Sequence, residues 1–144
     1  MQDLPHEYVV TASADTEGSV VVASGGLDAI VSAPPAQFGG PGTQWSPEDM
    51  LVAAVADCLV LTFRAIARAS KLPWGKIECR ATGTLDRVDR QMRFTRMDIV
   101  ATLSVPAGTD VAKAERLLEK AEQSCLITNT LNCERHLDTT VQEG

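Results

Sequence analysis

The segment from Ser46 to Ser70 places the strongest constraint on the fold, because its pattern predicts one long apolar helix. Ser46 is a good N-cap, Pro47 suits the first helical position, and Asp49 completes a Ser-x-x-Asp variant of the capping box. Apolar and small residues recur on one face at Leu51, Ala54, Val55, Cys58, Leu61, Thr62 and Ala65, and the apolar surface is widened by Val52, Leu59, Phe63 and Ile66. A helix with so much apolar surface belongs inside a protein.

The segments that precede this helix predict strands. Residues 8–12, 19–23 and 27–31 are β-branched or apolar and are separated by glycine-containing turn signals, so they favour a three-stranded meander. Residues 34–44 contain Pro34-Pro35 and a run of glycines, which indicate a loop.

The segments that follow predict a second group of strands and a second helix. Residues 77–85 and 97–105 alternate apolar with polar side chains, and the charged stretch 86–93 between them indicates an exposed hairpin end. A helix is predicted from Val111 to about Cys125, with its inner face formed by Val111, Ala114, Leu117, Leu118, Ala121 and Cys125, and residues 137–141 can add one strand. Without an internal repeat, the 144 residues predict a single domain, 1–144, of the α+β class.

Charge and hydropathy disfavour two classes of partner. The net charge of −6 repels phosphate backbones, which disfavours nucleic-acid binding. We found no uninterrupted apolar run of the ~20 residues needed to span a bilayer, so no membrane partner is predicted. The first residues lack the basic and apolar regions of a secretory signal, which favours a cytoplasmic protein.

Four cysteines, Cys58, Cys79, Cys125 and Cys133, stand in a chain too large to need a disulfide scaffold. Cys58 and Cys125 lie on the inner faces of the two predicted helices, which must touch in so small a domain. Only the thiolate is nucleophilic, and a thiolate is disfavoured near a helix C-terminus, where Cys125 is expected. This asymmetry favours Cys58 as the attacking thiol and Cys125 as the resolving thiol. Cys79 belongs to the inward set of a strand and is expected in the core.

Residues 39–58, which read GGPGTQWSPEDMLVAAVADC, resemble the motif of the OsmC/Ohr family. That motif is a glycine-rich loop, then Asn/Ser-Pro-Glu, then a small-residue helix that reaches the reactive cysteine ten positions after the glutamate, here Glu48 and Cys58. Residues 122–129, EQSCLITN, resemble the second family motif, in which the resolving cysteine precedes a turn rich in Ser, Thr and Asn. The two motifs and the order of strands and helices cover nearly the whole chain.

The resemblance implies an OsmC-like fold in which antiparallel strands wrap two central helices, with an intertwined homodimer and active sites at the subunit interface. It implies a cysteine-based peroxidase of oxidative stress defence that reduces organic, and inorganic, hydroperoxides. Cys58 would become a sulfenic acid, Cys125 would condense with it, and a small dithiol or thiol would reduce the disulfide. No metal or organic cofactor is required.

The resemblance also assigns Glu48 to a pair with an arginine that stabilises the reactive thiolate, although Glu48 equally suits a helix start. The family arginine usually lies between the first two strands, where this chain has Asp15-Thr16-Glu17-Gly18. The chain therefore resembles a divergent subgroup. Other candidates for the cation are Arg64, Arg68, Arg80 and Arg135.

Three alternatives remain open from the residues. Cys58, Cys125, Cys133 and His136 could form a four-ligand zinc site, although the sequence has no Cys-x-x-Cys pair, and Cys133 could serve as a third redox thiol. The apolar helices could instead line a pocket for a hydrophobic ligand, in a non-catalytic binding or redox-sensing module of the same fold.

Overall fold

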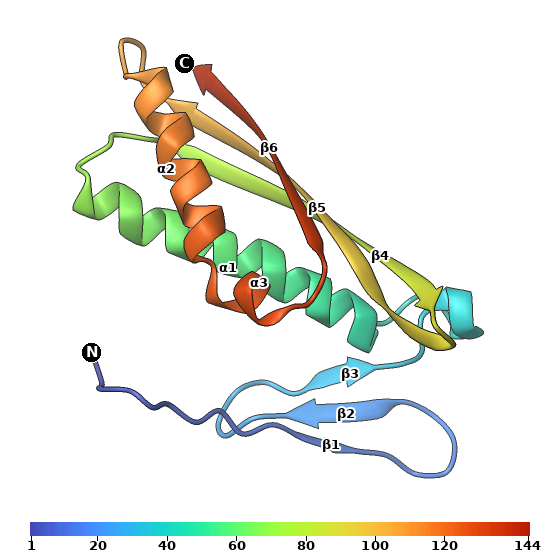
Figure 1. Cartoon of the computed structure of the whole chain (residues 1–144). Coiled ribbons are helices and arrows are strands. Elements are labelled where there is room, and N and C mark those ends of the chain that lie inside the picture. Colours follow the sequence, from blue (N-terminus) through green and yellow to red (C-terminus); the bar gives the residue numbers. More distant parts are fainter. The chain divides into compact units, whose positions relative to one another are not determined.

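The computed structural model describes all 144 residues, which divide into two compact units, Met1–Leu51 and Val52–Gly144. The chain contains six strands, two α-helices of three turns or more, one short α-helix and one 3-10 helix, so the α+β class is confirmed. Figure 1 shows the order of these elements along the chain. The assignment of the whole chain to a single domain stays a prediction.

The first unit contains a small antiparallel meander of strands β1 (Thr11–Ser13), β2 (Val20–Ala23) and β3 (Ile30–Ser32). Ala12 pairs with Val22, and Val21 pairs with Val31. The predicted meander is therefore present, although its strands are shorter than expected and residues 8–10 lie outside them. The loop after β3 contains a 3-10 helix, η1 (Ala36–Phe38).

Helix α1 (Pro47–Ala69) begins where the sequence predicts, because the capping box forms. The Asp49 backbone N–H donates to Ser46 Oγ at 3.0 Å, and the Ser46 hydroxyl donates to the Asp49 carboxylate at 2.8 Å. These bonds satisfy polar groups that the start of a helix leaves unpaired. Ser46 is buried, so the residue that caps the helix is packed within the chain.

The second unit contains a three-stranded sheet in the order β4 (Lys76–Val88), β5 (Gln91–Val105) and β6 (Glu134–Glu143). β4 and β5 form a long antiparallel hairpin, and its two turn residues, Asp89 and Arg90, both have positive φ. The charged stretch 86–93 is the exposed hairpin end that the sequence predicts. β6 runs parallel to β5, which corrects the expectation of antiparallel strands throughout. A parallel neighbour requires a crossover, and α2 supplies it.

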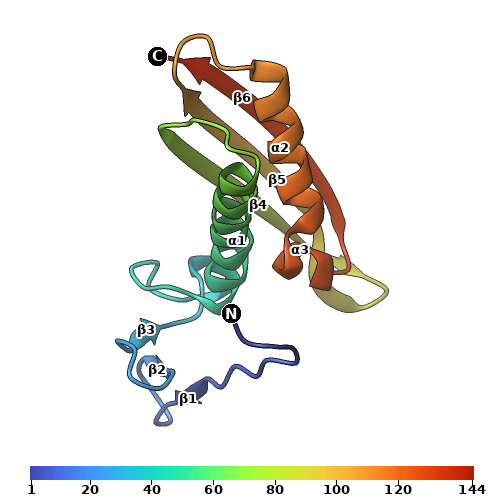
Figure 2. The same ribbon diagram turned by 90° about the vertical axis from the view of Figure 1, so that its left-hand side faces the viewer.

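Helices α1, α2 (Val111–Ser124) and α3 (Leu126–Thr130) lie on one face of this sheet, as Figures 1 and 2 show. The core between helices and sheet is formed by Val55, Leu59, Phe63, Ala67, Met97, Ile99, Ala101, Leu103, Val105, Ala114, Leu118 and Ala121. Gly83 on β4 lets α1 approach closely, because a Cβ there would lie 2.7 Å from Val52 Cγ2. The inner face predicted for α2 is confirmed at Ala114, Leu118 and Ala121, which are buried, whereas Cys125 follows the end of the helix.

The inner face predicted for α1 is wrong in part. The residues that α1 buries are Val55, Leu59, Phe63 and Ala67, whereas Leu61 and Ala65 are exposed. Because apolar residues surround this helix, periodicity alone does not show which side meets the sheet. Cys58 and Thr62 lie beside the buried stripe and are half-buried.

Helix α1 is also long and apolar enough, by length and composition, to cross a membrane, although only 22% of its most apolar stretch is buried within the chain. The core helix of a globular protein can have the same length and composition. The absence of a membrane partner therefore stays a prediction.

Candidate active site

The second unit brings the side chains of Cys58 and Cys125 close enough for each thiol to shift the pKa of the other. Cys58 lies in the middle of α1 and is half-buried, whereas Cys125 is 1% exposed. Both are free thiols. The structure thus joins the two cysteines that the sequence singles out, and their catalytic roles stay predictions.

Cys125 occupies the junction between α2 and α3. Its backbone is extended, with φ −66° and ψ 107°, so it ends one helix and begins the next. The Cys125 N–H donates to the Glu122 carbonyl at 3.3 Å, and the Cys125 carbonyl accepts from the Asn129 N–H at 2.9 Å. This break lets α3 turn toward α1, whereas the sequence predicts only a turn in this segment.

Arg135 on β6 holds this junction in place. Its guanidinium forms an ion pair with the Glu122 carboxylate at the end of α2 and donates to the Asn129 side-chain oxygen of α3 at 2.6 Å. The side chains of Arg135 and Glu122 are 27% and 13% exposed, so the pair is partly shielded from solvent. Arg135 therefore fixes the backbone that carries Cys125.

The surroundings of Cys58 favour its thiolate. Burial acts to raise the pKa of Cys58, but hydrogen bonds from the backbone N–H groups of Ile127 and Leu126, from the Cys125 thiol and from Thr62 together hold that pKa below its ordinary value. The Thr62 hydroxyl oxygen lies 3.8 Å from the Cys58 sulfur. The beginning of α3 thus supplies peptide N–H groups where a thiolate needs donors.

The surroundings of Cys125 favour its neutral thiol. Burial raises the pKa of Cys125, hydrogen bonds from Thr128 act in the opposite direction, and the hydrogen bond with Cys58 raises the pKa further. The two thiols therefore differ in the direction of their pKa shifts. Within the pair the proton therefore belongs on Cys125.

A recess of about 520 Å³ opens beside Cys58. Most of its lining side chains are apolar, namely Ala54, Leu61, Ala65, Leu126 and Ile127, and the others are Asp57, Cys58 and Thr62. No lysine or arginine lines the recess. The arrangement can place a small, largely apolar molecule against an activated sulfur.

Glu48 lies in the first turn of α1, within the first unit, and the cysteines belong to the second unit. In its own unit Glu48 lines an apolar cavity of about 510 Å³, together with residues of the meander and of the Pro34-Pro35 loop. It forms no ion pair in the chain, and it is not among the groups that shift the pKa of Cys58. The pairing of Glu48 with an arginine therefore stays a prediction.

The four arginines considered as activating cations do not contribute to the lowered pKa of Cys58. Arg64, Arg68 and Arg80 are exposed, and Arg135 is engaged with Glu122 and Asn129. Within the chain, hydrogen-bond donors rather than a cation favour the thiolate.

The remaining cysteines do not line the recess. Cys79 is on the inward side of β4, as predicted, and burial together with the charge of Cys125 raises its pKa to about 11, so it is neutral at physiological pH. Cys133 lines a separate recess of about 610 Å³ at the beginning of β6.

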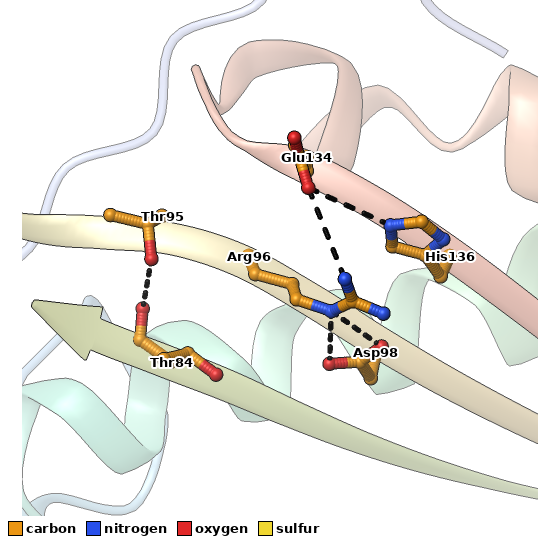
Figure 3. A network of polar contacts seen from close by, with 6 residues as sticks. All are labelled: Thr84, Thr95, Arg96, Asp98, Glu134 and His136. Atoms are coloured by element: carbon orange, nitrogen blue, oxygen red, sulfur yellow. Dashed lines mark hydrogen bonds and ion pairs between the residues drawn. The ribbon is translucent and has the colours of Figure 1, made fainter.

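The alternative zinc ligands are not gathered at one place. Cys125 is buried, whereas His136 lies on the exposed side of β6, where its ring nitrogen is 3.8 Å from the Glu134 carboxylate (Figure 3). The structure contains no group of three or more His, Cys, Asp or Glu residues placed to hold a metal ion.

Two threonines that contact the sulfurs are not among the residues predicted from the sequence. Thr62 follows Cys58 by four residues, and Thr128 follows Cys125 by three, and each hydroxyl lies within hydrogen-bonding distance of the preceding cysteine sulfur. In a helix, residues at these spacings lie on the same face. A search for hydroxyl residues at these spacings from each cysteine could have found both.

Comparison with known families and proteins gives matches that cover most of the chain. The family described as OsmC-like protein matches residues 40–140. The uncharacterized protein YmaD of Bacillus subtilis (strain 168) is 32% identical over 130 residues, which is 85% of each chain. Peroxiredoxin OsmC of Escherichia coli (strain K12) is 27% identical over 93 residues, which cover 65% of this chain and 64% of that protein.

Solved structures show the same fold at low sequence identity. An OsmC-like protein of unknown function from Vibrio cholerae superposes with a TM-score of 0.84 at 17% identity, over 94% of this chain and 99% of that one. An organic hydroperoxide resistance protein, OsmC, from Legionella pneumophila gives a TM-score of 0.75 at 20% identity, over 97% and 99%. The resemblance in fold is therefore confirmed.

Proposed function

Because the chain belongs to the OsmC-like protein family, we propose that it is a thiol-dependent peroxidase that reduces organic and inorganic hydroperoxides in oxidative stress defence. One observation carries the proposal: two free thiols that influence each other have opposite pKa shifts, lowered at Cys58 and raised at Cys125. Relatives named peroxiredoxin and organic hydroperoxide resistance protein support the same reaction class.

In the first step the Cys58 thiolate attacks the peroxide oxygen that is distal to the organic group. The O–O bond breaks, the alkoxide leaves and takes a proton to become an alcohol, and Cys58 becomes a sulfenic acid. The hydrogen bonds from Ile127, Leu126 and Thr62 lower the pKa of Cys58 and so favour the ionised sulfur before the attack. The largely apolar recess beside Cys58 suits the organic group of the hydroperoxide.

In the second step the Cys125 sulfur attacks the Cys58 sulfur. The S–O bond breaks, the oxygen leaves with the Cys125 proton as water, and a disulfide forms. A small dithiol then reduces the disulfide by two exchange reactions and leaves as its own disulfide. The cycle uses no metal or organic cofactor, and it requires a compartment that keeps thiols reduced, which we propose is the cytoplasm.

Titration of free thiols tests this cycle directly. The reduced protein is mixed with one equivalent of cumene hydroperoxide, and thiols are counted with a chromogenic reagent before and after. We expect two thiols to disappear together, and mass spectrometry of the digested protein to place the disulfide between Cys58 and Cys125. Retention of all four thiols, with the peroxide unconsumed, would reject the proposal.

The Cys125→Ser variant separates the two steps. Since it keeps the attacking sulfur and lacks the resolving one, we expect about one turnover and a sulfenic acid that a dimedone-type reagent traps at Cys58. The Cys133→Ser variant is a matched control and should turn over normally. Continuous turnover in Cys125→Ser, with the same reductant, would exclude Cys125 as the resolving thiol.

We propose that Glu48 has an orienting role and pairs with a cation, as its position in the family motif implies. The Glu48→Ala variant should then consume peroxide more slowly while its melting temperature changes little, because Glu48 is not part of the capping box that starts α1. A large fall in melting temperature with a normal rate would favour a purely structural role.

We also propose that the protein is a homodimer. The support is the apolar surface that the single chain leaves uncovered: only 22% of the most apolar stretch of α1 is buried, and Leu61 and Leu126, which line the recess, are 51% and 68% exposed. A second copy can cover such a surface. Sedimentation equilibrium should give twice the mass of the chain, and a monomer at micromolar concentration would contradict the proposal.

A second candidate is a binding module for a hydrophobic ligand, favoured by the apolar cavity of about 510 Å³ in the first unit. Under this function, hydroperoxide would oxidise no thiol, while a fluorescent fatty acid would bind and be displaced by unlabelled fatty acid. The thiol titration therefore distinguishes the two candidates.

A further inference from the structure

Thr128 is a buried polar residue whose hydroxyl is directed to a reacting sulfur. Its exposure is 2%, and its Oγ1 donates to Cys125 Sγ at 3.3 Å. Thr130, two residues later on the same short helix, uses its hydroxyl differently, because it donates to the Leu126 backbone carbonyl at 2.8 Å. Of these two hydroxyl groups, only that of Thr128 donates a hydrogen bond to a sulfur.

The position of the hydroxyl matters most when the disulfide is reduced. Cys58 is half-buried and lines the recess, whereas Cys125 is 1% exposed. An incoming reductant thiolate therefore has access to the Cys58 sulfur and not to the Cys125 sulfur. As the new S–S bond to Cys58 forms, the Cys58–Cys125 bond breaks, and the electron pair leaves on the Cys125 sulfur as a thiolate.

This leaving group is unfavourable without help. A leaving thiol of high pKa departs slowly, and burial raises the pKa of Cys125. A hydroxyl hydrogen bond to the sulfur stabilises the anion more than the neutral group, because hydrogen bonds to charged groups are the stronger ones. Thr128 is the hydroxyl in this position.

We propose that Thr128 is a catalytic residue whose hydroxyl stabilises the charge on the Cys125 sulfur, first when Cys125 attacks the sulfenic acid and again when Cys125 leaves during reduction. The reductant is then a small dithiol that enters the recess and forms its mixed disulfide with Cys58. Its second thiol attacks that mixed disulfide and releases the Cys58 thiolate, and Cys125 regains a proton from solvent. The role of Thr128 in disulfide formation rests on the proposed peroxidase function, whereas its role in disulfide reduction requires only that the Cys58–Cys125 disulfide exists.

The resolving step is tested by rapid mixing of the reduced protein with cumene hydroperoxide, followed by acid quench and thiol analysis. In Thr128→Val, we expect sulfenic acid to form at the normal rate and the disulfide to form about tenfold more slowly, as for loss of a hydrogen bond to a charged group. Thr128→Ser should restore most of the rate because it keeps the hydroxyl. Thr130→Val, the matched control on the same helix, should behave as the unaltered protein.

The reduction step is tested without peroxide. The disulfide is formed with diamide, and dithiothreitol then reduces it under pseudo-first-order conditions. Thr128→Val should be reduced about tenfold more slowly, again because one hydrogen bond to a charged sulfur is lost. In an alkaline titration followed by thiolate absorbance, the same variant should show one thiol with a higher pKa, since the Thr128 hydrogen bond lowers the pKa of Cys125.

These results separate the two proposals. If hydroperoxide oxidises no thiol but Thr128→Val still slows reduction of the diamide-formed disulfide, the peroxidase function fails and the role of Thr128 in reduction stands. Equal rates in Thr128→Val and the unaltered protein, or a Thr128→Ser variant as slow as Thr128→Val, would overturn the role of Thr128. Thr128→Ala, which adds no atoms, replaces Thr128→Val if the melting temperature shows that valine disturbs the packing.

Discussion

Two polar clusters lie on opposite faces of the same sheet and differ in almost every physical respect. The sulfur cluster, defined as Cys58, Thr62, Cys125 and Thr128, lies on the face that the helices cover. The ion network, defined as Arg96, Asp98, Glu134 and His136, lies on the open face (Figure 3). The sheet register places Arg96 opposite Glu134 and Asp98 opposite His136.

The ion network consists of charged groups joined by hydrogen bonds and ion pairs. Arg96 Nε donates to both carboxylate oxygens of Asp98 at 2.8 and 2.9 Å, and this hydrogen bond lowers the pKa of Asp98. However, the Arg96 and Asp98 side chains are 43% and 40% exposed, and water screens charges at such positions. The sulfur cluster carries no formal charge when it is fully protonated. The hydrogen bonds to its two sulfurs are partly buried, where one hydrogen-bond donor can decide which of the two thiols keeps its proton.

The largest expected effect is the loss of activity when the attacking sulfur is removed. Cys58→Ser should consume no hydroperoxide above the uncatalysed rate, because a serine hydroxyl is not ionised at neutral pH and does not form a sulfenic acid. His136→Gln, in the ion network, should keep the full rate. Peroxide consumption is followed by a ferrous oxidation assay. Full steady-state activity in Cys58→Ser would refute the assignment of the site.

The pH dependence of the first step reports the pKa of Cys58 in the sulfur cluster. Only the thiolate reacts, and the pKa of Cys58 is lowered. The second-order rate constant should therefore rise with pH, with a midpoint below the pKa of free cysteine, and reach a plateau above that midpoint. Well below that midpoint, the rate should change about tenfold per pH unit, the limit for a single titrating group.

A hydroxyl variant on each face sharpens this pH comparison. Thr62→Val should move the midpoint upward, because the Thr62 hydrogen bond lowers the pKa of Cys58. Thr140→Val, an exposed substitution on β6, should leave the profile unchanged. The profiles are measured by stopped-flow with cumene hydroperoxide. If they coincide for the unaltered protein and both variants, Thr62 does not lower the pKa of Cys58.

Much of the fold could be predicted from local sequence patterns, because the informative residues act on their neighbours. Ser46 and Asp49 set the start of α1, and the alternation in residues 77–85 and 97–105 marks the hairpin. The buried side of α1 could not be predicted, because Leu61 and Leu59 are equally apolar and only the contact with the sheet distinguishes them.

The same distinction holds for the site. Cys58 and Cys125 stand out because they lie on predicted helices. Thr128 contacts Cys125 because both belong to the turn formed by the short helix α3, and a helix of five residues is too short to be predicted from a sequence pattern. Arg135 was considered only as a cation for Cys58. Its pairing with Glu122 depends on the parallel placement of β6, which is set by a crossover and not by a local pattern.

The Arg135–Glu122 pair is intermediate between the two clusters in exposure, and its effect should be intermediate too. Arg135→Gln leaves the Glu122 carboxylate, 13% exposed, without its charged partner. We expect the free energy of unfolding to fall by about 2 kcal/mol, less than for a fully buried pair. Urea denaturation followed by circular dichroism measures the change. The double variant Arg135→Gln/Glu122→Gln should regain part of the loss, and a double variant less stable than Arg135→Gln would argue against the pair.

The smallest effect is expected in the ion network itself, where Arg96→Gln removes the cation that joins Asp98 and Glu134. Although the hydrogen bonds to Asp98 are short, the exposed charges are solvated almost as well when they are separate, and ordering a long side chain costs entropy. We therefore expect the urea midpoint of Arg96→Gln to match that of the unaltered protein at physiological salt, and the peroxidase rate to be unchanged. Repeating the measurement at low salt should reveal a small destabilisation, because screening weakens as ionic strength falls. A loss at physiological salt as large as that of Arg135→Gln would show that exposure does not determine how much each of these ion pairs stabilises the fold.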